Sequence, residues 1–320
     1  MNEAAKQSLS SHSLHKNHCK CKKDNQLKTT RLPTPIQAST SRRLVLVFWT
    51  TLLGLALSTT CVQAMDDDSH AFRDCAQCPC MVPVPGGEYS MGSPDYEDGR
   101  GLDEGPVHHV KIPDGLSVSR FEITFDDWKI CQDAGACALD PVDAGWGRGS
   151  RPVIYVGWYD TAQYLSWLTE ISEHFYRLPT EAEWEYFARA GTTGPYHTGA
   201  ELLATDANWE IRTTADRIAN TTVAKTVPVG EYAPNSFGLH DIHGNVSEWV
   251  QDCYDKSAYA EFSGYPEARN GDQNCRRVAK GGTSHYSATY ARSANRSDFD
   301  PHLRSFDVGF RVVRDASVRP

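Results

Sequence analysis

The sequence contains none of the short motifs that assign a chain to the commonest enzyme classes. There is no phosphate-binding loop, no dinucleotide fingerprint and no Gly-x-Ser-x-Gly elbow, the patterns that position a phosphate group or an activated serine. Internal repeats and heptads are also absent. Kinase and serine-hydrolase functions are therefore poor interpretations of this chain.

Positive charge is scarce after the N-terminal region. Residues 1–43 hold nine lysine and arginine residues against Glu3 and Asp24, a net charge of +7. The whole chain is at −9 and residues 44–64 are uncharged, so the remainder carries about −16. Nucleic-acid binding requires a basic face, and the sequence therefore predicts no nucleic-acid partner.

The sequence has one long apolar run, Leu44–Leu57. It follows the basic segment, which is the order of the basic and hydrophobic regions in a secretory signal. Cys61–Ala64 (CVQA) ends in the small-x-small pattern that a signal peptidase prefers. Residues 1–64 are therefore predicted to be a basic leader and signal peptide. The remaining protein starts at Met65, is periplasmic or secreted, and has no stable membrane span. An uncleaved signal anchor is the alternative, although the run is short for a span.

Seven of the ten cysteines lie after the predicted cleavage site, and an oxidising compartment favours disulfides between them. The cluster Cys75–Cys80 (CAQCPC) could instead be a redox or soft-metal motif, because thiolates bind Cu(I) and zinc. Bridging is the favoured interpretation in an exported chain. The simplest pairing joins neighbours and leaves Cys80 over: Cys75 with Cys78, Cys131 with Cys137, and Cys253 with Cys275.

Most of the chain has the pattern of one loop-rich domain. From Val82 to Arg314 there are many Gly and Pro turns, numerous Trp and Tyr residues, and few long periodic segments. This length is within the range that a single core can reach. We therefore predict a single α+β domain over residues 82–314, with a cysteine-containing linker at 65–81 and a tail at 315–320.

Leu178–Gly191 is the clearest of three predicted helices. Thr180 and Glu183 have the spacing of a capping box, and Gly191 is a typical stop. An apolar stripe follows the helical period: Trp184, Phe187 and Ala188.

The other two predicted helices carry weaker signals. Thr124 can cap the segment FDDWKICQD, with Gly135 as its stop. Tyr159–Phe175 has Asp160 as a plausible cap and an apolar face at the helical period. That face is predicted to consist of Ala162, Leu165, Leu168 and Ile171.

The segment His240–Cys253 (HDIHGNVSEWVQDC) contains the residue types of a calcium-binding loop. Asp241 and Glu248 are hard oxygen donors, and Gly244 with Asn245 permits a tight turn that points carbonyls inward. An ordinary turn capped by Asp241, with Glu248 solvated, explains the spacing equally well. From the residues alone both interpretations stay open.

Histidines offer a second metal hypothesis. His240 and His243 form an H-x-x-H pair, and His285 or His302 could supply a third ligand to iron or zinc. Without a helical pattern around His240 and His243, this spacing is a weak signal.

The segment Lys280–Arg296 (KGGTSHYSATYARSANR) has the polar composition of an active site, although it contains no cysteine and no carboxylate. Two glycines allow close approach of the backbone, and hydroxyl groups, His285 and two arginines follow. Arg292 and Arg296 could bind an anion or could hold loops through carbonyl groups. For Arg311 the structural role is favoured.

Taken together, seven motifs resemble the formylglycine-generating enzyme (sulfatase-modifying factor) family in the family's order. They run from about Met81 to Arg314: MVPVPGGEYSMGS, FEIT, RPVIYVGWYDTAQYLSWL, RLPTEAEWEYFARAG, FGLHDIHGNVSEWVQD, KGG and VGFRVVR. The resemblance implies a compact, loop-rich relative of the C-type lectin architecture. It also implies structural calcium.

Carried over position by position, the family's calcium ligands are the Asp241 and Glu248 side chains and the Gly244 and Val246 carbonyls. The resemblance also suggests a contribution from Glu122, in FEIT. A second calcium site in the family uses an asparagine near Asn208, but its partner has no clear match around Asn220–Val223.

The family's copper site is missing from the sequence. Its oxidase members bind Cu(I) through two cysteines after the glycine pair, and the metal activates dioxygen against a substrate cysteine. Those positions are Tyr286 and Ala291 here, and neither side chain provides a thiolate. The known copper mechanism therefore cannot operate at this place, and any redox metal is unknown.

Two functions remain open. Exported family members without the cysteine pair, of the pyoverdine-maturation type, imply an oxidation of a peptide or small aromatic substrate. The site would then be lined by five residues, with His285 as a proton carrier: Thr283, Ser284, His285, Tyr286 and Arg292. The alternative is a non-catalytic, calcium-stabilised binding module for a peptide or glycan.

Overall fold

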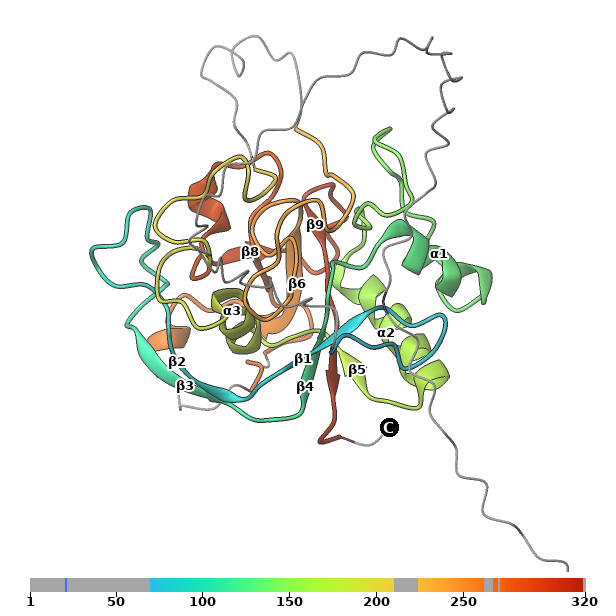
Figure 1. The fold of residues 1–320 in the computed structure, drawn as a ribbon, viewed down its shortest axis with the longest axis horizontal. Coiled ribbons are helices and arrows are strands. Elements are labelled where there is room, and N and C mark those ends of the chain that lie inside the picture. The colour runs from blue at the N-terminus through green and yellow to red at the C-terminus, as the bar shows by residue number, and fades with distance from the viewer. Residues whose placement is uncertain (1–20, 22–69, 210–223, 262–266, 270, 319–320) are drawn as a thin grey trace, which may run out of the picture. The chain divides into compact units, whose positions relative to one another are not determined.

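Short strands form three small sheets, and loops make up most of the remaining backbone (Figure 1). The computed structural model describes residues 21, 70–209, 224–261, 267–269 and 271–318. The predicted leader apart from Cys21, and the segment Asn220–Val223, lie outside these residues.

The first sheet joins the two ends of the domain. Its order is β1 (Met81–Val84), β4 (Leu116–Ser119), β10 (Val313–Asp315) and β5 (Tyr176–Arg177), with every neighbour antiparallel. The closing segment VGFRVVR thus supplies a strand between β4 and β5. This pairing fixes the C-terminal residues against the start of the domain.

The other two sheets are a hairpin and a mixed sheet. β2 (Gly87–Met91) pairs with β3 (His108–Ile112). The third sheet has the order β8 (Ser297–Phe299), β7 (Arg277–Lys280), β6 (Ser247–Cys253) and β9 (Val308–Gly309), and only the β6–β9 pair is parallel. β6 carries the end of the candidate calcium segment His240–Cys253, and β7 ends at Lys280, where the glycine-rich segment begins.

The predicted capping box at Thr180 and the predicted cap at Thr124 are both confirmed, and the second is also a capping box. In α1 (Phe125–Asp133), Thr124 accepts from the Asp127 amide and Asp127 accepts from the Thr124 amide. In α3 (Glu181–Arg189), Thr180 and Glu183 make the same reciprocal bonds. Each satisfies amide groups that have no partner within the helix.

The prediction for α2 (Trp158–Ser172) was wrong in two respects. The helix begins at Trp158 with Gly157 as its N-cap, and Asp160 lies in the first turn, where it accepts from the Gly157 amide at 2.8 Å. Of the predicted face, Leu168 is buried and two further residues, Leu165 and Ile171, pack against the core, whereas Ala162 is exposed. Tyr164 and Trp167, which were not predicted, are also buried. The larger aromatic side chains bury more apolar surface, so they take the core-facing positions.

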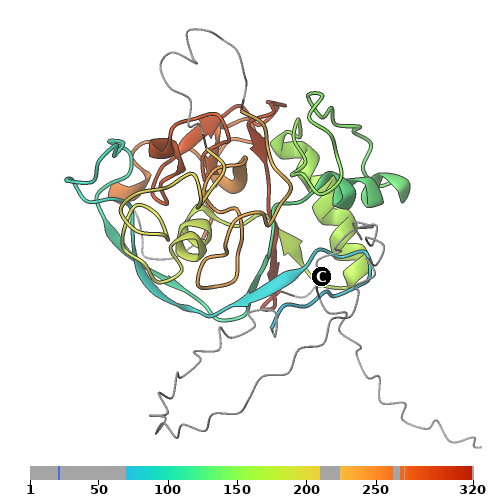
Figure 2. The same ribbon diagram turned by 45° about the horizontal axis from the view of Figure 1, so that its top comes forward.

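Aromatic side chains fill the core on both sides of the third sheet. Trp128 of α1 stacks on Tyr164 of α2 with ring centroids 5.9 Å apart, and Phe310 meets Tyr164 edge-on at 5.6 Å. Trp184 and Phe187 of α3 belong to a second cluster. Both views place α1 and α2 on one side of the domain and the β2–β3 hairpin on the other (Figures 1 and 2). The described residues also include the short 3-10 helices η2 (Ala258–Glu261) and η3 (Ala288–Ala291).

Every cysteine that the structure describes is in a disulfide. The three predicted local pairs are confirmed. Cys80, which the sequence left unpaired, is joined to Cys21. Cys21 belongs to the predicted leader, so a mature molecule that has lost its leader after cleavage at Ala64 cannot contain this bridge.

No helix among these residues has the length and apolar character needed to cross a membrane.

Candidate functional site

The candidate calcium loop and the glycine-rich segment are hydrogen-bonded to each other. The Gly244 amide donates to the Gly281 carbonyl at 2.7 Å, and the Ser284 amide donates to the Asn245 carbonyl at 3.0 Å. Gly244 is required here, because its φ is +80° and a Cβ would lie 2.2 Å from a carbonyl oxygen of Asn208. The loop therefore acts as a support for the segment after β7.

Three carboxylates lie buried around this loop against a single guanidinium. Glu122, Asp241 and Glu248 are each less than a tenth exposed, and Arg311 is fully buried. Arg311 donates to Glu248 Oε2 at 2.6 Å and to the Ser119 and His240 carbonyls, which agrees with the structural role expected for it. Buried charge is costly unless it is compensated, and one cation does not balance three carboxylates.

Two oxygens in this cluster have no hydrogen-bond donor. Asp241 Oδ2 accepts from the Gly230 amide and Glu248 Oε2 from Trp184 Nε1, whereas Asp241 Oδ1 and Glu248 Oε1 are buried without a partner. Glu122 differs, since Asn245 Nδ2 and the Val246 amide donate to its two oxygens. Unpartnered buried oxygens of hard donors are what a calcium ion would use.

The surroundings disfavour the charged forms of these acids. Burial raises the pKa of Asp241 to about 6, with Glu248 adding to the shift. Burial, followed by the charges of Asp241 and Glu248, raises the pKa of Glu122 well above its ordinary value. Among the residues described, no group of three or more His, Cys, Asp or Glu side chains is arranged to hold a metal. A calcium site here therefore requires the main-chain carbonyls that the family resemblance implies.

The histidine hypothesis is not supported by the arrangement. His243 donates from Nδ1 to the Ala291 carbonyl at 2.7 Å, and its Nε2 accepts from the His197 amide at 3.1 Å. Burial lowers the pKa of His243 to about 3, so the ring is a neutral bridge between two loops. Neither nitrogen is free for a metal.

His285 stands between a carboxylate and a hydroxyl. Its Nε2 lies 2.9 Å from Asp307 Oδ1, and its Nδ1 lies 3.2 Å from Thr283 Oγ1. Thr283 and Ser284 are buried, whereas the His285 side chain is 15% exposed. The Asp307 contact meets the distance of an ion pair but not the alignment of a hydrogen bond. An imidazole placed between a carboxylate and a hydroxyl is a suitable proton carrier.

Aromatic rings surround His285, and we call this group the aromatic surface. The rings of Tyr286 and Phe306 lie 4.8 and 4.9 Å from the imidazole, and Tyr290 lies 5.3 Å from Tyr286. Phe306 also contacts two further rings, those of Trp146 and Tyr155. Tyr155 has a φ of +59°, a strained conformation for an aromatic residue of the kind found at functional sites.

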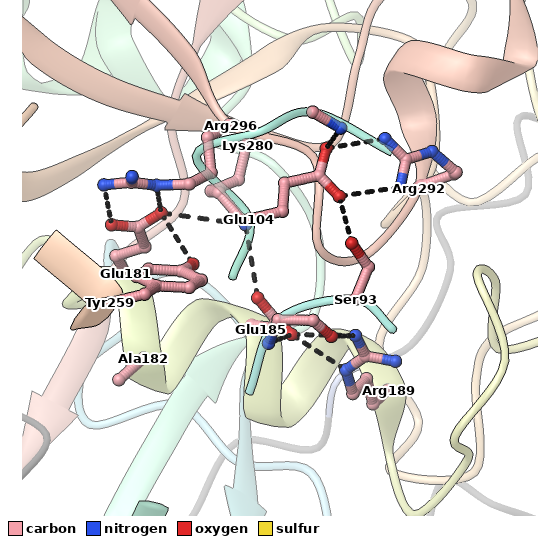
Figure 3. A network of polar contacts seen from close by, with 12 residues as sticks. Ser93, Glu104, Glu181, Ala182, Glu185, Arg189, Tyr259, Lys280, Arg292 and Arg296 are labelled. Carbon is pink, nitrogen blue, oxygen red and sulfur yellow. Dashed lines mark hydrogen bonds and ion pairs between the residues drawn. The ribbon is translucent and has the colours of Figure 1, made fainter. Parts of the chain in front are cut away.

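Arg292 does not join this surface. It is 1% exposed, and its guanidinium donates to Glu104 at 2.6 and 2.8 Å and to Glu97 at 2.7 Å. Arg296 likewise pairs with Glu181. Figure 3 shows both arginines within one buried network that also includes Lys280, Glu185 and Arg189. The network ties the β2–β3 loop to α3 and to the segment after β7.

The two residues at the family's copper-binding positions differ in solvent exposure. Tyr286 is 39% exposed on the aromatic surface, whereas Ala291 is buried. The residues present do not fit a copper ion held by two thiolates.

The domain is a loop-rich α+β fold in which the candidate calcium loop, within His240–Cys253, supports the glycine-rich segment. We call it the support loop. This is the architecture of formylglycine-generating enzymes. Residues 68–316 match the family model described as a sulfatase-modifying factor enzyme 1-like domain. The chain belongs to this family, as a member without the copper-binding cysteine pair.

Three relatives illustrate the range of the family. PvdO from Pseudomonas aeruginosa is a solved structure with 32% identity and a TM-score of 0.67, and the alignment covers 77% of this chain and 97% of that one. The formylglycine-generating enzyme of Streptomyces coelicolor is 34% identical over 54% of this chain and 55% of its own length. The serine/threonine-protein kinase Pkn1 of Chlamydia trachomatis is 30% identical over 73% of this chain. The chain spans about half of the first curated relative and 38% of the kinase.

Sequence reasoning missed Asp307 and three rings of the aromatic surface, Trp146, Tyr155 and Phe306. These residues come from segments far from His285 in the sequence. Phe306 and Asp307 directly precede the family's closing motif, and this position was the one available signal.

Proposed function

We propose that this protein is an exported enzyme that oxidises a peptide or small aromatic substrate bound on the aromatic surface beside His285. The arrangement of Asp307, His285 and Thr283 next to partly exposed rings carries this proposal. Thr283, Ser284 and Tyr286 shape the site, and the metal-binding cysteines of the oxidase members play no part in it.

His285 would act as the proton carrier in this reaction. Its Nε2 lies beside the Asp307 carboxylate, which leaves Nδ1 as the nitrogen that exchanges a proton with the substrate. The contact with Thr283 is the longer of the two, and a substrate hydroxyl or a water can displace it to reach Nδ1. Dioxygen, the family's co-substrate, is the expected electron acceptor.

Calcium would have a structural role in the same unit. The side chains of Asp241 and Glu248, with the Gly244 and Val246 carbonyls, would hold the ion, and Glu122 would lie in its surroundings. Two unpartnered oxygens and the excess of buried negative charge support this assignment. A bound ion supplies positive charge that keeps the loop in the conformation on which the glycine-rich segment rests.

We expect His285→Asn to lower the rate of substrate oxidation by about 100-fold or more, the usual effect of losing a general acid–base group. Oxygen consumption can be measured with a panel of tyrosine- and cysteine-containing peptides and simple phenols, and substrate binding by fluorescence. His302→Asn is the matched control, because His302 is exposed outside the site. Equal rates for His285→Asn and wild type would remove His285 from the mechanism.

Export leads to a prediction about Cys80. Cleavage after Ala64 removes Cys21, so the mature protein should contain one thiol that reacts under denaturing conditions. Mass spectrometry of the exported protein before and after alkylation measures this, and Cys80→Ser should abolish the modification. A full-length mass with Cys80 protected would instead show that the leader is retained through the Cys21–Cys80 bridge.

The alternative function is a calcium-stabilised binding module without catalysis. The aromatic surface favours it specifically, since partly exposed rings can stack on a peptide or a sugar without any redox group. Elemental analysis of gently purified protein separates the two hypotheses. Calcium alone would favour the module, whereas redox-active iron or copper would favour the enzyme.

A further inference from the structure

Residues 93–107, within the loop between β2 and β3, hold three exposed large apolar side chains, of which Val107 is 43% exposed and the other two are almost entirely in solvent. Leu102 is 94% exposed and Tyr96 is 89% exposed. Single exposed apolar residues are ordinary, but two large ones that are almost fully exposed on one loop are more typical of a contact site. Both project from a loop rather than line a concave site, so they suit a macromolecule better than a small ligand.

Buried contacts hold the backbone of this loop in place. Glu104 is fully buried, and its carboxylate accepts from Arg292, from the Ser93 hydroxyl at 2.7 Å and from the Gly101 amide at 3.0 Å. Arg292 also donates to the Gly99 carbonyl at 2.6 Å. These contacts, several of which are drawn in Figure 3, spare a binding partner much of the cost of ordering the loop.

The exposed charges of the loop are acidic. Asp95 and Asp98 face solvent, and the one basic residue of the loop, Arg100, is 17% exposed and donates to the Ser93 carbonyl. Arg100 also lies 3.2 Å from Asp95, but Asp95 is 96% exposed, and an ion pair this exposed is weak, so its carboxylate stays accessible to a partner. Negative charge disfavours an anionic lipid surface or a nucleic acid as the partner. It also disfavours a second copy of this acidic chain, since like charges across an interface are costly.

The loop borders the aromatic surface. Gly99 packs so closely against Thr289 that a Cβ on it would lie 2.3 Å from the Thr289 methyl group. Thr289 directly precedes Tyr290, which is 49% exposed. A partner that covers the loop can therefore extend toward His285.

We propose that residues 93–107 form a docking surface for a cationic polypeptide segment. Apolar side chains of the partner cover Tyr96 and Leu102, while its lysine or arginine side chains face Asp95 and Asp98. This inference concerns binding and does not depend on the chemistry at His285.

Fluorescence anisotropy with two labelled 12-residue peptides tests the proposal on the mature protein. One peptide carries leucine and tyrosine among lysines, and the other has glutamate in place of each lysine. We expect the lysine peptide to bind at least about 10-fold more tightly at 50 mM salt, and to lose affinity at 200 mM salt because the exposed charges are screened.

Loop variants assign the contacts. Tyr96→Ser with Leu102→Ser should weaken binding of the lysine peptide by about 10-fold or more, whereas Asp95→Asn with Asp98→Asn should remove most of its salt dependence. Val142→Ser, at an exposed apolar residue elsewhere, should leave binding unchanged. Equal binding of both peptides, or unchanged binding by both double variants, would overturn the proposal. So would a dimer in light scattering that Leu102→Ser dissociates, because the occupant would then be a second copy.

Discussion

Adding a calcium chelator should lower the melting temperature of this protein by about 5–10 °C. A ligand present at about 100 times its Kd stabilises a fold by roughly 2.7 kcal/mol, and each kcal/mol corresponds to about 2–4 °C in a domain of this size. The physical reason is the unbalanced buried charge around Arg311. Removing the ion would leave Asp241 Oδ1 and Glu248 Oε1 without any positive partner.

The chelator response should disappear in Asp241→Ala, which itself starts from a lower melting temperature. Asp140→Ala is a control of the same chemistry, because Asp140 is an exposed carboxylate paired with Arg148, and it should respond as wild type does. Differential scanning calorimetry with and without chelator, followed by calcium add-back, measures both. A chelator response that persists in the double variant Asp241→Ala, Glu248→Ala would refute the assigned ligands.

The sequence was most informative where the signal is local. The capping boxes at Thr124 and Thr180, the disulfides Cys75–Cys78 and Cys131–Cys137 and the family motifs all depend on residues within a short span. Local hydrogen bonds decide such features, so the pattern of residues is sufficient to predict them. Cys253 and Cys275 are 22 positions apart, and their pairing followed from joining successive cysteines. The family resemblance then supplied the fold, which periodicity could not supply for so many short strands.

The partners of long-range contacts could not be predicted from the sequence. Asp307 reaches His285, and Glu104 reaches Arg292 across 188 positions of the chain. Arg292 had the same sequence signal as His285, since both follow the glycine pair. Burial separates them, and burial depends on the packing of the whole domain. Arg292 therefore remains only a predicted site residue, with its guanidinium committed to two glutamates.

The support loop links stability to function in a testable direction. Gly244 and Asn245 hold the glycine-rich segment through main-chain bonds, and His243 holds Ala291 at its far end. A loosened loop would displace Thr283 and His285 together. Loss of calcium should therefore weaken substrate binding at temperatures where the protein is still folded.

Replacing Arg292 by methionine should destabilise the protein by about 3–5 kcal/mol, because it leaves the fully buried Glu104 without its cation. The melting temperature should fall by about 10 °C. Adding Glu104→Gln to Arg292→Met should recover part of the loss, since the uncompensated charge is then removed. Arg148→Ala breaks an exposed pair and should change little.

Arg292→Met, alone and combined with Glu104→Gln, also distinguishes a structural role of Arg292 from a role in substrate binding. A structural residue that is replaced lowers the melting temperature, and the second substitution restores both stability and substrate binding together. A residue that contacts substrate behaves differently: binding falls while the melting temperature stays close to wild type, and Glu104→Gln does not rescue it. Both Glu104 oxygens and Glu97 already accept from the Arg292 guanidinium. We therefore expect the first pattern, in which Arg292 holds residues 93–107 against the segment that carries His285.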